Sequence, residues 1–61
     1  MLKEIRTSKG LTQAALAAAA GVNIRQIQKM ESGEIQPENI TLGTALRLAK
    51  ALGVEPADLI G

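Results

Sequence analysis

The sequence lacks several residue types on which common protein functions depend. Its 61 residues include no cysteine, no histidine and no Phe, Tyr or Trp. Without cysteine the chain can form neither a disulfide nor a thiolate zinc site. Without histidine it lacks the commonest general base and the commonest metal ligand. Without aromatic side chains it cannot stack bases as most single-strand and RNA-binding modules do.

Long apolar runs are also missing. The longest run, AALAAAAGV at residues 14–22, is too short and too weakly apolar to span a bilayer. Residues 1–10 contain no apolar segment of the kind found in signal peptides. The carboxylates show no paired spacing that suggests acid–base chemistry, and there is no glycine-rich phosphate loop. We therefore expect a cytoplasmic protein that is not an enzyme and that needs no metal or cofactor.

What the sequence does contain is a regular series of helix signals. Apolar residues recur at helical spacing, with Thr12, Asn23 and Thr41 as candidate N-caps and glycines after the last turns. No alternation typical of strands is present, and a chain of this length has room for one core. We predict a single all-α domain over residues 1–61 with five helices, at Leu2–Lys9, Gln13–Ala20, Ile24–Glu31, Leu42–Leu52 and Glu55–Ile60.

The predicted core is aliphatic and includes one long stripe on the fourth helix. The apolar positions of that helix predict a buried face made of Leu42, Ala45, Leu46, Ala49 and Leu52. Two residues of the last segment, Leu59 and Ile60, are expected to close the core.

The third helix divides unusually into two faces. Ile27, Met30 and Glu31 fall on one side, which we expect to pack inward. The opposite side is mostly polar and carries Ile24, Arg25, Gln28, Lys29 and Ser32. A plain solvated face is the simplest interpretation of such a stripe, and a ligand-binding face is the alternative.

The segment TQAALAAAAGVNIRQIQKME favours the alternative, because a short turn with glycine joins its two helices as in a helix-turn-helix. Together with LKEIRTSKGLTQAALA, IQKMESG, Pro37 and LRLAKALGVEPADLI, it resembles the phage-repressor family of helix-turn-helix domains, also called Cro-like or XRE-like. The resemblance implies a compact five-helix bundle with its helix-turn-helix at about residues 12–31. It also implies sequence-specific binding of double-stranded DNA by a transcriptional regulator of the repressor type, with the third helix in the major groove.

The side chains of the exposed stripe suit that role. Arg25 and Lys29 can donate to guanine O6 and N7, and Gln28 can pair with adenine N6 and N7. Ile24 can pack on a thymine methyl group. We therefore expect these four residues to contact bases.

The resemblance and the helix ends together suggest further site residues. Backbone N–H groups and polar side chains at helix N-termini can hold phosphate, and the family commonly makes a phosphate contact at the position of Gln13. We expect contacts to the DNA backbone from Thr12, Gln13, Asn23 and Ser32. The family also commonly forms a partly buried ion pair at the positions of Arg6 and Glu31.

Some features depart from the family pattern and keep other interpretations open. The second helix is rich in alanine, the loop after the third helix carries Glu34 and Glu38, and the net charge is only +1. A small protein-interaction or antitoxin-like module, or an engineered DNA-binding scaffold of the same fold, would fit these features too. Besides DNA, the expected partner is a second copy of the chain on a palindromic site. The end of the fourth helix and residues 55–61 would then provide the contact.

Overall fold

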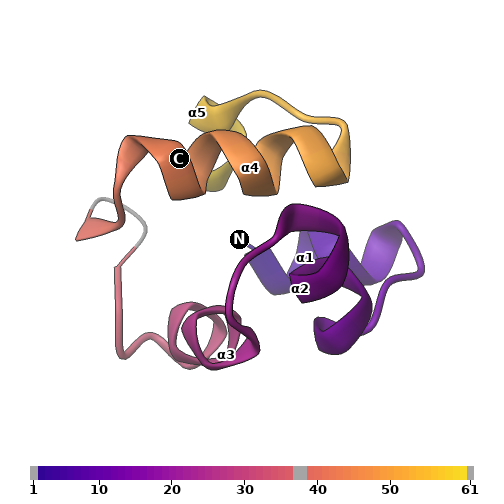
Figure 1. Ribbon diagram of the computed structural model, residues 1–61, viewed down its shortest axis with the longest axis horizontal. Coiled ribbons are helices and arrows are strands. Elements are labelled where there is room, and N and C mark those ends of the chain that lie inside the picture. The colour runs from indigo at the N-terminus through magenta and orange to yellow at the C-terminus, as the bar shows by residue number, and fades with distance from the viewer. Residues whose placement is uncertain (1, 37–38, 61) are drawn as a thin grey trace.

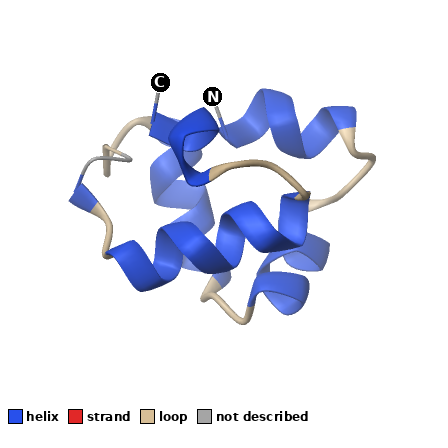
Figure 2. Cartoon of the chain, turned by 90° about the horizontal axis from the view of Figure 1, so that it is seen from above, coloured by secondary structure: helices blue, strands red, loops and turns tan. Residues whose placement is uncertain are grey.

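The computed structural model describes residues 2–36 and 39–60, and for Ile60 it describes the backbone alone. Within these ranges the regular secondary structure is helical and no residue lies in a strand (Figure 2). The helices are α1 (Leu2–Ser8), α2 (Gln13–Ala20), α3 (Ile24–Ser32), α4 (Leu42–Leu52) and α5 (Pro56–Ile60). The predicted all-α class and the five-helix architecture are confirmed, with helix ends within a residue of those expected.

The helix ends follow from the capping residues. The Thr12 hydroxyl oxygen accepts the Ala15 N–H at 3.0 Å, and the Asn23 Oδ1 accepts the Arg25 N–H at 2.8 Å. Thr41 does the same at the start of α4, where its oxygen accepts the Thr44 N–H at 3.2 Å. Each bond satisfies a backbone donor that a helix leaves unpaired at its first turn.

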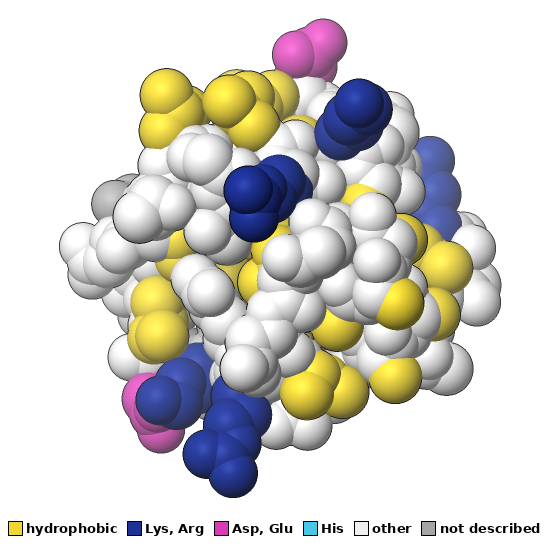
Figure 3. All heavy atoms as spheres, viewed as in Figure 1, with side chains coloured by type: hydrophobic (Ala, Val, Ile, Leu, Met, Phe, Trp, Pro, Cys, Tyr) yellow, Lys and Arg dark blue, Asp and Glu magenta, His cyan; other side chains and the backbone are white. Residues whose placement is uncertain are grey.

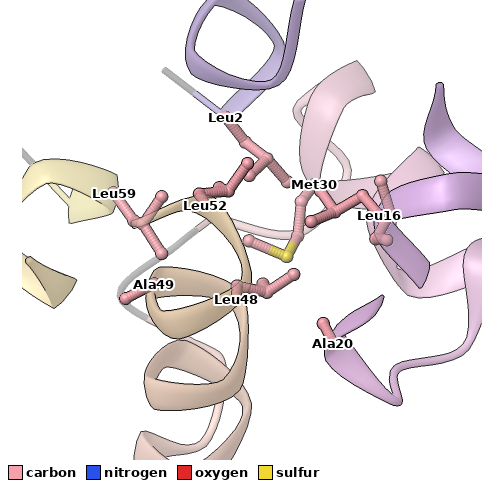
Figure 4. Packing of buried hydrophobic residues seen from close by; sticks show 9 residues of the cluster. Leu2, Leu16, Ala20, Met30, Leu48, Ala49, Leu52 and Leu59 are labelled. Atoms are coloured by element: carbon pink, nitrogen blue, oxygen red, sulfur yellow. The ribbon is translucent and has the colours of Figure 1, made fainter. Parts of the chain in front are cut away.

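All five helices contribute to one aliphatic core. α2 packs against both α3 and α4, α4 packs against α5, and α1 packs against α3 (Figure 1). Leucines from α1, α2 and α4 converge on the Met30 side chain, and Leu59 of α5 lies beside α4 (Figure 4). The buried apolar residues are Leu2, Leu16, Ala20, Ile27, Met30, Ala45, Leu48, Ala49, Leu52 and Leu59.

The predicted buried face of α4 is wrong at two positions. Leu42 is 72% exposed and Leu46 is 50% exposed, whereas Leu48, which is not part of the predicted stripe, is fully buried. The reason is that α2 and α5 cover the side of α4 that carries Ala45, Leu48, Ala49 and Leu52. The leucines of this helix lie on one side of it, over an arc that is wide enough for two overlapping stripes. The neighbouring helices decide which of the two is buried.

A few of the sequence-based predictions concern residues that the structure does not describe. Met1, Pro37, Glu38 and Gly61 lie outside the described residues, and so does the side chain of Ile60 that we expected in the core. In the part of the chain that is described, no helix has the length and apolar character needed to cross a membrane.

Candidate nucleic-acid interface

A tight turn sets α3 against α2. α2 ends at Ala20, and the next residue, Gly21, has a φ of +67° in the left-handed region that glycine adopts without steric cost. The Val22 N–H is donated back to the Ala17 carbonyl at 3.0 Å, and α3 begins two residues later at Ile24. Val22 packs against the core, which fixes the direction of the turn. The chain thus forms two helices joined by a short glycine turn, the arrangement of a helix-turn-helix.

The polar stripe of α3 faces outward. Its side chains Arg25, Gln28, Lys29 and Ser32 are exposed, whereas Ile27 and Met30 on the opposite side are buried. Basic side chains gather at the surface where α3 lies, at the lower left of Figure 3, with an acidic side chain against them. This surface is able to donate hydrogen bonds to an electron-rich partner.

Ile24 differs from the rest of the stripe. Its side chain is half-buried at the first turn of α3, between the exposed and the buried faces. Part of it is covered by the fold itself, and only the remainder can pack on a partner such as a thymine methyl group.

The side chains of the capping residues already form hydrogen bonds within the fold. Only their remaining polar atoms can contact a ligand. The Asn23 Oδ1 holds the Arg25 N–H, so a phosphate contact from Asn23 would come from its Nδ2. Thr12 uses its hydroxyl oxygen as an acceptor, and its O–H is the group left to donate. Both residues are exposed at the N-terminal ends of their helices.

Gln13 and Ser32 are engaged more fully than the sequence suggests. The Gln13 Nε2 donates to the Glu31 Oε1 at 3.0 Å, which leaves the second N–H of that amide for a phosphate. The Ser32 O–H donates to the Lys29 carbonyl at 3.1 Å. Ser32 would have to give up this bond before it could donate to DNA.

Arg6 and Glu31 form a bidentate ion pair between α1 and α3. The Arg6 Nε donates to Glu31 Oε2 at 2.6 Å and its Nη2 donates to Glu31 Oε1 at 3.0 Å. The Arg6 Nη1 donates to the Leu11 carbonyl at 2.7 Å. The two charged side chains are only 10% and 5% exposed. With Gln13, this pair ties α1, the start of α2 and the end of α3 together.

The pair also changes the acidity of the carboxyl. The hydrogen bond from Arg6 is the main cause that lowers the pKa of Glu31 below its ordinary 4.5. Burial opposes this shift, and the hydrogen bond from Gln13 supports it. The carboxylate is therefore ionised near neutral pH, where Arg6 balances its charge.

Three contacts of this region escaped the sequence analysis, and one of them is the bond from Gln13 to Glu31 described above. The Lys29 Nζ lies 3.7 Å from the Glu34 Oε2, in an exposed ion pair just beyond the end of α3. The Leu11 carbonyl accepts from Arg6, as described above. The opposite charges of Lys29 and Glu34 were visible in the sequence, but their spacing of five residues is not a contact spacing within a helix.

A short helical bundle with an outward-facing donor stripe on the second helix of a helix-turn-helix defines a class of small DNA-binding domains. The sequence model of the helix-turn-helix family matches residues 2–59, and the chain belongs to this family. The match confirms the predicted membership in the Cro-like or XRE-like group, whose members are DNA-binding regulators of transcription and typically not enzymes. Searches of curated proteins and of solved structures returned no match.

Proposed function

We propose that the chain reads a specific site in double-stranded DNA through the major groove with α3. In this proposal the exposed side chains Arg25, Gln28 and Lys29, with the exposed part of Ile24, contact base edges. The start of α2 and the N-terminus of α3 hold the flanking phosphates through Thr12, Gln13 and Asn23. Occupancy of a promoter site would then block or recruit the transcription machinery, with repression as the leading expectation.

One observation carries this proposal. The third helix has its apolar residues Ile27 and Met30 in the core. Its outer face exposes three side chains that can donate hydrogen bonds, those of Arg25, Gln28 and Lys29. Charged side chains are also common on the outer face of a helix that only shields the core, so the position of α3 as the second helix of a helix-turn-helix is what favours DNA. A helix that enters a major groove needs such donors, because guanine presents two acceptors there.

Replacing Arg25 tests the proposal. We expect Arg25→Ala to cost about 1–3 kcal/mol on the preferred site and to relax the preference at one or two base pairs, because a bidentate donor to guanine is lost. The measurement is a titration of wild-type and variant protein onto a preferred duplex and onto duplexes altered at single positions.

Arg47→Ala is the matched control. Arg47 is exposed on α4, so this variant loses the same charge away from α3. It should weaken binding to all duplexes by a similar factor, if it weakens binding at all. A uniform loss for Arg25→Ala as well would show that Arg25 contacts only phosphate, and would remove it from the base-reading set.

We also expect two copies to act together on DNA. One small module covers only about 600–1,000 Å² of protein surface, and two half-sites one helical turn apart, about 34 Å, let two copies bind one face of the duplex. The free chain should be a monomer or a weak dimer, and pairing should strengthen on a palindromic duplex. Sedimentation of the free protein and titration onto one half-site and onto a correctly spaced pair test this. A tight dimer at nanomolar concentration without DNA, or equal affinity per copy on both duplexes, would contradict it.

A further inference from the structure

The end of α3 places an acidic side chain against the proposed reading face. Gly33 follows the last residue of α3, and its φ of +86° turns the chain back toward the helix. The Ile35 N–H is donated to the Lys29 carbonyl at 3.1 Å, and Ile35 packs against the core. Glu34 lies between these two fixed residues, so the backbone itself holds it beside the last turn of α3.

The Glu34 carboxylate forms an ion pair with Lys29 of the exposed stripe. Its Oε2 lies 3.7 Å from the Lys29 Nζ, and the side chains of Glu34 and Lys29 are 64% and 52% exposed. The Glu34 N–H is held by the Ser32 hydroxyl oxygen at 3.4 Å. Any DNA group within reach of Lys29 is therefore also near a negative charge.

We propose that Glu34 is a counter-charge that lowers the affinity of the α3 surface for DNA, by holding Lys29 in an ion pair and by repelling phosphate. This inference rests on the proposed function, since it concerns the same surface. Binding would require Lys29 to exchange the carboxylate for a DNA acceptor. The surface would then neutralise fewer phosphates than it has basic residues.

Glu34→Gln removes the charge but keeps the size and polarity of the side chain. One additional phosphate charge neutralised should make the slope of log K against log salt steeper by about 0.9. This corresponds to a gain in affinity of about five-fold at 0.15 M salt. Because the pair is exposed, the melting temperature of the free protein should change little.

Three further variants show where the effect comes from. Glu55→Gln removes an equal charge from an exposed position just before α5, and controls for the change in net charge. Lys29→Gln, alone and combined with Glu34→Gln, shows whether the two residues act on one another. The gain from Glu34→Gln should exceed the gain from Glu55→Gln, and most of the excess should disappear in the Lys29→Gln background.

The experiment is a titration of all five proteins onto the preferred duplex and onto a random duplex at three salt concentrations, with thermal melts of the free proteins. A gain from Glu34→Gln no larger than that from Glu55→Gln would overturn the inference, provided that the wild type binds DNA. A loss on the preferred duplex alone would also overturn it, because Glu34 would then be accepting from a base such as cytosine. If the wild type binds neither duplex even at low salt, the proposed function itself fails.

Discussion

Ile27→Asp should unfold the domain. Ile27 is fully buried at the centre of the inward face of α3, among leucines of the neighbouring helices. A carboxylate there would have no partner, and a buried unpaired charge costs several kcal/mol. A domain of this size has only about 3–9 kcal/mol of stability to lose. Circular dichroism and thermal melting should show loss of the helical signal and of the cooperative transition at neutral pH.

Two control variants separate burial from other effects at this helix. Ile27→Val should fold and cost about 0.5–1.5 kcal/mol, because it removes one buried methylene. Gln28→Asp puts the same carboxylate one residue further along, on the exposed face, and should leave the fold intact. A near-native melt for Ile27→Asp would mean that the faces of α3 are inverted, and the proposed reading surface would then be wrong as well.

Glu31→Ala should cause the second largest loss of folding stability. It leaves the Arg6 guanidinium, with only a tenth of its side chain exposed, without its ionic partner, and it also removes the acceptor of the Gln13 amide. Breaking a buried ion pair by removing one partner costs about 3–5 kcal/mol. We expect about 2–3 kcal/mol here, since Arg6 retains its bond to the Leu11 carbonyl and some contact with water. The melting temperature should fall by roughly 10–20 °C.

The same carboxyl predicts a dependence of stability on pH. The pKa of Glu31 is lower in the folded chain than its ordinary value, so the folded state favours the ionised form. Its contribution to stability is full above pH 4.5 and disappears as the pH falls through the lowered pKa. Thermal melts between pH 7 and pH 2.5 should show a smaller acid destabilisation in Glu31→Gln than in the wild type. If the melting temperatures of the two proteins fall equally with pH, the ionisation of Glu31 does not contribute to the stability of the fold.

The helices were predictable because their ends are encoded locally. Thr12 and Asn23 supply side-chain oxygens to the first turns of α2 and α3, and Gly21 and Gly33 take left-handed conformations after the last turns. Each of these signals involves residues a few positions apart, so it can be recognised without knowledge of the rest of the fold.

The packing of α4 was only partly predictable. Its leucines form one broad face, made of Leu42, Leu46, Leu48 and Leu52. A local pattern cannot show which part of this face the neighbouring helices cover. The same limit applied to the site. The exposed stripe on α3 follows from helical spacing, whereas the bond from Gln13 to Glu31 joins residues 18 apart and depends on the crossing of α2 and α3. Which atoms of Gln13 remain for DNA is therefore a property of the tertiary structure.

The central claim is that the outer face of α3 reads base sequence. The most direct measurement is a selection of bound duplexes from a random pool at two salt concentrations, with the wild type and Arg25→Ala in parallel. The account predicts one enriched motif for the wild type at both concentrations, and a motif for Arg25→Ala that is degenerate at one or two positions. Duplexes retained at low salt without an enriched motif, or no retained duplexes at all, would contradict it, and the latter result would favour a protein-interaction module with this fold.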